Sequence, residues 1–227
     1  MLSNDIVSEI LAYRPKELSK FQISALQVKP GRYGEGDTLC GTSCPQLRRI
    51  AKKYANIPDD ECEKLLCYNL HEARFVALVI LRLKFFSNPE KIAHIYLDNT
   101  RHINNWDLVD CSAPYIIGEY MHLTNNYELV YKLAASDNLW ENRIAIVSTL
   151  SLIKAGSFTL ALELCEKFLT HKHHLIHKAC GWMLREISKR NSATVIAFIK
   201  EHHNISSITK SYALEWLKKR KTIINSH

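Results

Sequence analysis

The stretch His102–Gly118, HINNWDLVDCSAPYIIG, combines an apolar helical pattern with two carboxylates. Trp106 and Asp110 are four residues apart, so on a helix they share one face, one turn apart, whereas Asp107 points elsewhere. Pro114 has no backbone N–H to bond the carbonyl of Asp110, so we expect a bend there. Either Trp106 is ordinary core and the two aspartates are solvated or cap the helix, or this stretch carries chemistry.

A repeat surrounds this stretch. Successive apolar helices begin at cations that are each followed within three residues by an alanine: Arg74, Arg143, Lys178 and Lys210. The intervals are 69, 35 and 32 residues, and the first is two periods whose missing member falls within residues 106–110. The four tryptophans are 34, 42 and 34 residues apart. Such a period in a helical chain predicts stacked helix pairs, a HEAT-like or armadillo-like solenoid that forms one domain over residues 1–227.

The composition predicts an all-α fold. The chain of 227 residues is 47% hydrophobic and has only 7 Gly and 6 Pro, four of the glycines within 31–41. Residues 29–42 are therefore expected to form a loop. Helices are expected to start at Pro15, at Ser43 or Cys44 before Pro45, and at Pro58, and a further apolar helix is expected over residues 70–86.

Neither a membrane nor a metal is expected. The longest apolar run, 75–81, ends at Arg82, and no secretory signal opens the sequence, so a cytoplasmic location is predicted. Seven cysteines without a CxxC pair fit reduced, mostly buried thiols. The histidines at 171, 173, 174 and 177 match no standard metal-site spacing, so no metal and no cofactor are predicted.

The net charge of +7 is unevenly distributed, because residues 171–227 hold eleven Lys or Arg against three Glu. A lopsided basic surface suggests a polyanion such as nucleic acid, although solvated lysines would give the same count. If the second helices of the pairs line a concave face, that face would carry cations suited to a duplex backbone. These are Arg74, Arg143, Lys178, Arg185 and Lys210, with Arg48 on a further basic helix face.

Two positions break local rules. Asp110 stands where the other repeats have a cation, so a role other than DNA affinity is expected for it. Gly181 precedes Trp182 inside a helix and weakens that helix by roughly 1 kcal/mol relative to Ala. Its reason is close approach either by a ligand or by a neighbouring helix.

The chain resembles the AlkD family of DNA alkylation repair glycosylases, which have HEAT-like repeats. The matching stretches cover most of the chain: GRY at 31–33, the helix start at 45–49, WDLVD at 106–110 followed by Pro114, SDNLWENRIAI at 136–146, and KACGWMLRE at 178–186. The segment 34–38 departs from the family in being glycine-rich and acidic, and the last helix pair is compact. As a set these stretches are specific, whereas each alone is weak.

The resemblance implies roles for individual residues. It assigns the catalytic carboxylate to Asp110, aromatic walls to Trp106 and Trp182, an active-site arginine to Arg143, and an aromatic that helps close the site to Tyr33. The implied reaction releases N3- or N7-alkylpurines from duplex DNA. Such bases are cationic and leave without protonation, so a carboxylate that stabilises oxocarbenium-like charge suffices. Because no lysine neighbours Asp110, a monofunctional glycosylase is expected.

Two other functions fit the same pattern. One is a non-catalytic DNA-binding repeat protein, and the other is a scaffold for protein partners. Steep salt dependence of duplex binding would separate the first from the second. A monomer is expected, because a solenoid that wraps a duplex needs no second subunit.

Overall fold

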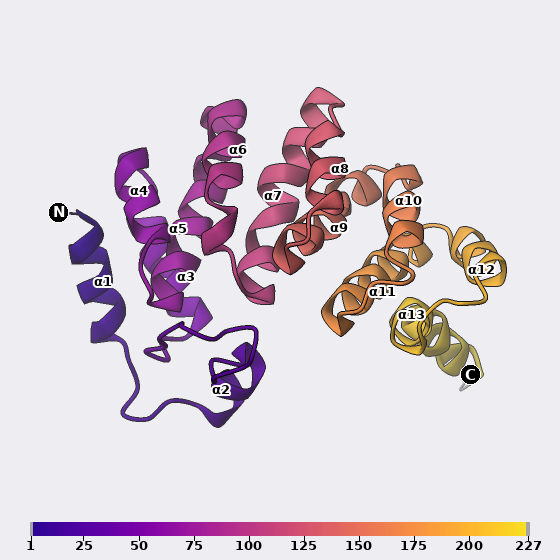
Figure 1. Cartoon of the computed structure of the whole chain (residues 1–227), viewed down its shortest axis with the longest axis horizontal. Coiled ribbons are helices and arrows are strands. Elements are labelled where there is room, and N and C mark those ends of the chain that lie inside the picture. The colour runs from indigo at the N-terminus through magenta and orange to yellow at the C-terminus, as the bar shows by residue number, and fades with distance from the viewer. Residues whose placement is uncertain (1, 226–227) are drawn as a thin grey trace. The chain divides into compact units, whose positions relative to one another are not determined.

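The computed structural model describes residues 2–225, and side chains as far as residue 218 (Figure 1). The described chain is a succession of helices with one isolated β-bridge, between Thr38 and Leu70. The helices are α1 Leu2–Ala12, α2 Lys20–Leu26, α3 Cys44–Lys53, α4 Asp59–Leu66, α5 His71–Lys84, η1 Phe85–Ser87, α6 Pro89–Asp98, η2 Thr100–His102, α7 Trp106–Thr124, α8 Glu128–Ala135, α9 Leu139–Lys154, α10 Thr159–Lys167, α11 His174–Ser188, α12 Ser192–Glu201 and α13 Ser207–Asn225. The predicted all-α helical-repeat fold is confirmed.

The chain divides into two compact units, an N-terminal unit that ends at Ile116 and a C-terminal unit that begins at Ile117. In the N-terminal unit, α5 packs against α3, α4 and α6, and α1 packs against α3, α4 and α5. In the C-terminal unit, α9 packs against α8, α10 and α11, while α11 packs against α12 and α13. The single domain over residues 1–227 stays a prediction.

Side-chain contacts between neighbouring repeats join residues about one period apart. Their separations lie between 30 and 36 residues in the pairs Glu72–Cys40, His71–Asp107, Arg143–Leu175, Thr209–His177 and Arg185–Glu215. The four repeat alanines, at 77, 145, 179 and 213, are fully buried. A small residue at these positions lets the neighbouring helix approach closely, which explains the alanines of the pattern.

Most predicted helix starts are confirmed, and one is wrong. Ser43 and Gln46 form a capping box at α3, and α4 begins after Pro58 with acidic residues in its first turn. Pro15, however, does not start α2, which begins at Lys20 after Ser19. Pro15 lies instead against Gly41, whose φ of +86° and missing Cβ allow that approach.

Gly181 is explained by helix packing. A Cβ at this position would lie 2.5 Å from the Cβ of Tyr212 and 2.9 Å from the carbonyl oxygen of Thr209. Both neighbours belong to α13, so α11 and α13 pack closely at this glycine. Of the two reasons considered from the sequence, close approach by a neighbouring helix is the one observed.

Within residues 2–225, the helices are too short or too polar to traverse a lipid bilayer.

Candidate functional site

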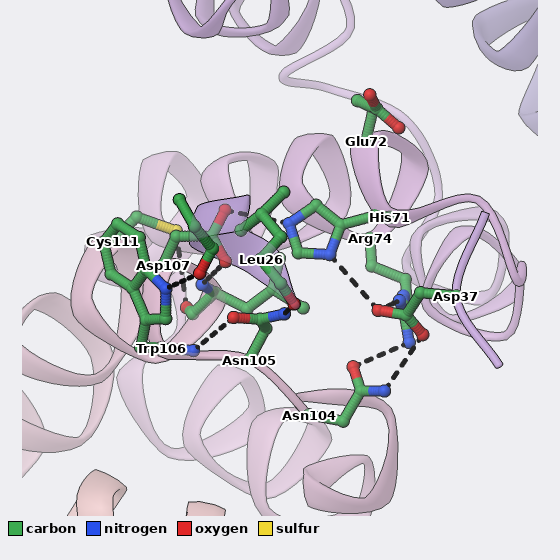
Figure 2. A network of polar contacts seen from close by, with 12 residues as sticks. Leu26, Asp37, His71, Glu72, Arg74, Asn104, Asn105, Trp106, Asp107 and Cys111 are labelled. Carbon is green, nitrogen blue, oxygen red and sulfur yellow. Dashed lines mark hydrogen bonds and ion pairs between the residues drawn. The ribbon is translucent and has the colours of Figure 1, made fainter. Parts of the chain in front are cut away.

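The start of α7 is bound to the end of α2. Asn105, fully buried, accepts a hydrogen bond from the backbone N–H of Trp106 at 2.9 Å and donates its amide to the carbonyl of Leu26 at 3.0 Å (Figure 2). The half-buried indole of Trp106 donates its Nε1–H to the carbonyl of Ala25, also at 2.9 Å. These bonds fix the orientation of the indole ring.

The side chains of Tyr33 and Trp106 bond the same carbonyl oxygen, that of Ala25. The Tyr33 hydroxyl donates to the carbonyl oxygen of Ala25 at 2.7 Å, so this oxygen accepts hydrogen bonds from both aromatic side chains. The structure therefore brings together two of the aromatic residues that the sequence assigned to one site.

A buried cluster of charges lies beside Trp106. His71, at the first position of α5, is 2% exposed. Its Nε2 lies 2.8 Å from Oδ2 of Asp107, and its Nδ1 lies 3.4 Å from Oδ2 of Asp37 (Figure 2). Because carboxylate oxygens accept hydrogen bonds and both ring nitrogens face one, the ring carries both protons and a positive charge.

The carboxylates keep His71 protonated. Burial lowers the pKa of His71, but the hydrogen bonds to Asp107 and Asp37 outweigh both burial and the nearby Arg74, and the pKa rises to about 9. For Asp37, burial raises the pKa, and the bonds from His71, Asn104 and Arg74 outweigh this, so its pKa is lowered. At neutral pH the cluster thus holds paired opposite charges.

Arg74 belongs to this cluster and not to an open basic face. Its side chain is 5% exposed, its Nη2 lies 2.5 Å from Oδ2 of Asp37, and its Nη1 donates to Oδ1 of Asn104 at 2.9 Å. The predicted DNA-facing position of Arg74 is therefore wrong, because the guanidinium neutralises a buried carboxylate from the loop before α3. Asn104 completes the arrangement by donating to Oδ1 of Asp37 at 3.0 Å.

The loop over residues 37–41 is fixed on the first turn of α5. The backbone N–H of Thr38 donates to the carbonyl of Asn69, and the N–H of His71 donates to the carbonyl of Thr38, each at 2.9 Å. The buried carboxylate of Glu72 accepts from the N–H groups of Cys40 at 3.0 Å and Gly41 at 2.7 Å. These bonds hold Asp37 where it reaches both His71 and Arg74.

A small cavity of about 140 Å³ adjoins Trp106 and Asp107. Its lining is mainly apolar and includes residues from α2, α3, α5 and α7: Phe21, Gln22, Ala25, Leu26, Thr42, Cys44, Leu47, His71, Glu72, Phe75, Trp106 and Asp107. The cavity gives the start of α7 a hydrophobic wall next to the charged cluster.

Asp110 is half-buried, one turn after Trp106 on α7. Burial raises the pKa of the Cys111 thiol, and the charges of Asp107 and Asp110 raise it further. Negative charge therefore gathers at this part of α7. Asp107 was expected to point elsewhere on the helix than Asp110, which stays a prediction; its carboxylate pairs with His71.

The C-terminal unit holds the other predicted site residues. Arg143 is 5% exposed, and its Nη1 donates to the carbonyl of Leu175 at 2.7 Å. On α11, Trp182 and Lys178 are half-buried, and Arg185 forms an ion pair with Glu215. Lys210 on α13 is exposed, as is Arg48 on α3 of the N-terminal unit. The convergence of Asp110 and Trp106 with Arg143 and Trp182 stays a prediction.

The histidine run before α11 has a structural role. His173 caps α11 by accepting the backbone N–H of Leu175, and the ring of His171 accepts the backbone N–H of His173. Among residues 2–225, His, Cys, Asp and Glu side chains do not gather in threes that could hold a metal ion.

Sequence reasoning missed four members of the site, namely Asp37, His71, Asn104 and Asn105. A usable signal existed, because His71 lies 34 residues after Asp37 and 36 before Asp107, close to the repeat period. Residues one period apart face each other on adjacent repeats. The spacing could have paired these three charges.

The fold and the site together define a helical-repeat protein with an indole and a carboxylate one turn apart on α7. The chain belongs to the DNA alkylation repair enzyme family, whose sequence model matches residues 15–217. In fold it is similar to a predicted DNA alkylation repair enzyme from Enterococcus faecalis, with a TM-score of 0.67 and 18% identity over 89% of this chain and 99% of the other. A search of curated proteins gave no match.

Proposed function

We propose that this protein is a monofunctional DNA glycosylase that hydrolyses the N-glycosidic bond of cationic N3- and N7-alkylpurines in duplex DNA. Membership of the alkylation repair family supports a role in repair. The observation that carries the proposal is the half-buried carboxylate of Asp110 placed one turn from Trp106, whose indole is held by Ala25.

The chemistry needs few protein groups. An alkylpurine that carries a positive charge leaves as a neutral molecule, so a general acid is dispensable. Positive charge develops on the deoxyribose instead, and Asp110 would stabilise it and orient the attacking water. The face of the Trp106 indole, fixed in orientation, would pack on the cationic nucleotide and favour its charge.

Residues of the C-terminal unit complete the proposed site. Trp182 would supply a second aromatic wall, and Arg143 would hold a phosphate near the lesion. Lys178, Lys210 and Arg48 would contact the DNA backbone, whereas Arg185 would do so only on leaving Glu215. Arg74 would position Asp37 rather than touch DNA. We propose that the protein acts as a monomer in the cytoplasm and needs neither a metal nor a cofactor.

Base release tests the proposal. The purified protein is incubated with duplex DNA that contains 7-methylguanine, and free base is measured over time. Asp110→Asn should lose release by at least about a hundredfold, the scale of removing one electrostatic group from a transition state, while duplex binding persists. The exposed Asp98 gives a matched control, since Asp98→Asn makes the same chemical change outside the site.

Each outcome is decisive. If Asp110→Asn releases base as fast as the parent protein, the catalytic assignment is wrong. If the parent protein binds duplex DNA with steep salt dependence but releases no base, the non-catalytic DNA-binding alternative is correct. If it binds no DNA, the protein-scaffold alternative is favoured.

A further inference from the structure

Arg82, which lies near the end of α5, stacks on an aromatic ring of α7. Its guanidinium carbon lies 3.3 Å from the centroid of the Tyr115 ring, and both side chains are half-buried. A cation this close to a ring is held there by cation–π attraction, and the ring leaves the guanidinium N–H groups available to an anion. Arginine is thereby prepared for a planar, two-point contact with an anion.

The contact that holds Arg82 is with an aromatic ring. Several other cations of the N-terminal unit neutralise carboxylates, among them Lys53 with Glu9, Lys91 with Asp59 and Arg74 with Asp37. Within the portion of the chain that the structure describes, Arg82 takes part in no ion pair. Its contact with Tyr115 holds the group without satisfying its hydrogen-bond donors.

A second arginine is held in the same way nearby. The guanidinium of Arg48 on α3 lies 5.9 Å from the ring centroid of Phe75, and Arg48 is exposed. The charges of Arg48 and Arg82 both lower the pKa of the Cys111 thiol, against the larger effect of burial, which is consistent with positions near this part of α7. Cys111 follows Asp107 by one turn and precedes Tyr115 by one turn, which places the three on one helix face.

The position beside Asp107 and Asp110 suggests the purpose of these cations. Both aspartates raise the pKa of the same thiol, so carboxylates and guanidinium groups act together on this part of α7. A polyanion that approaches the carboxylates is repelled unless cations offset the repulsion. Arginine side chains held on rings provide that offset and match the bidentate geometry of a phosphodiester.

We infer that Arg82, stacked on Tyr115, is a binding residue for a DNA phosphodiester next to the Asp110 carboxylate, with Arg48 as its partner. The inference rests on the proposed function, because it takes the DNA backbone as the ligand. It adds a contact residue, Arg82, and a supporting ring, Tyr115, to the proposed site.

Duplex binding as a function of salt tests this inference. Dissociation constants of a fluorescent duplex are measured by anisotropy over a range of salt concentrations. Arg82→Gln should weaken binding about tenfold at low salt and reduce the slope of log K against log salt by about 1. The matched control is Arg14→Gln, which removes the same charge from an exposed arginine between α1 and α2 and should change neither quantity appreciably.

Two further variants separate the stack from the charge. Arg82→Lys keeps the charge but not the planar group, so the salt slope should be retained while affinity falls about threefold or more. Tyr115→Leu should weaken binding, whereas Tyr115→Phe, which keeps the ring, should not. A thermal melt of each variant reports whether it is folded.

The outcomes distinguish this inference from the proposed function. If Arg82→Gln behaves as Arg14→Gln does while the parent protein binds duplex, the Arg82 assignment is overturned and the glycosylase proposal is untouched. If the expected Arg82 effects occur but no base is released, the glycosylase proposal fails and the phosphate contact stands. If the parent protein binds no duplex, both are overturned.

Discussion

The charge on His71 should make the free energy of unfolding of the protein depend on pH between about 6.5 and 9. The pKa of His71 rises from 6.5 to about 9 in the folded protein because Asp107 and Asp37 bond its protonated ring. Each pKa unit corresponds to about 1.4 kcal/mol, so the cluster contributes roughly 3 kcal/mol of stability. The ring is 2% exposed, so solvent screens this contribution little.

The sign follows from the direction of the shift. A raised folded-state pKa stabilises the protein fully below pH 6.5, where the unfolded chain is also protonated. The stabilisation is lost as pH rises from 6.5 through 9, because the unfolded chain releases its proton first. Between pH 7 and 8 the free energy of unfolding should fall by about 1 kcal/mol, which corresponds to a decrease in Tm of roughly 2–4 °C.

Other titrating groups also act in or near this window. The pKa values of His102, His171, His173 and His174 are lowered by burial and by neighbouring groups, so these residues add stability as pH rises to about 7.5, in the opposite direction to His71. Buried thiols such as Cys62, whose pKa burial raises to about 12, act from about pH 8 upward. The difference between the parent protein and a variant without His71 cancels these shared effects and therefore isolates His71.

Urea denaturation of the parent protein and of His71→Gln at several pH values checks the prediction. The variant keeps a donor for one carboxylate but does not titrate, so its stability should be lower and nearly constant between pH 7 and 8. If the variant keeps the same pH slope as the parent, His71 is not the titrating group and the charged-cluster argument is wrong.

Two further substitutions test features within the residues that the family model matches. Trp106→Phe keeps an aromatic ring but removes the indole N–H that bonds the carbonyl of Ala25. The free energy of unfolding should therefore fall by about 1 kcal/mol in denaturant titrations, and release of 7-methylguanine should slow. Unchanged stability and release would show that the bond to Ala25 does not matter. Gly181→Ala places a methyl group against Tyr212 and Thr209 and should destabilise the protein by about 1–3 kcal/mol in a thermal melt. A neutral result would mean that α11 and α13 separate easily.

The repeat could be predicted because it depends on local pattern. The cation and alanine pairs mark α5, α9, α11 and α13, and the tryptophan spacing places α7 between α5 and α9. Helix starts at Pro45 and Pro58 were also predictable, since proline and capping residues act within a few positions. Sequence patterns of this kind report which residues face the core.

The charged cluster could not be predicted from local pattern. Arg74 is indistinguishable from a solvent-facing cation unless one knows that Asp37 reaches it from a glycine-rich loop. His71 likewise depends on two carboxylates that are brought to it by adjacent repeats. Partners of buried charges are decided by packing, so a charge count or a helix pattern leaves them undetermined.

The carbonyl oxygen of Ala25, in α2, is bonded by residues that are synthesised at very different times. It accepts hydrogen bonds from Tyr33, eight residues later in the sequence, and from Trp106, 81 residues later. The neighbouring carbonyl of Leu26 accepts one from Asn105, 79 residues later. Neither Asn105 nor Trp106 can bond α2 until it has been synthesised. During synthesis α2 therefore emerges early, and its aromatic pair is complete only after the first turn of α7 has been added.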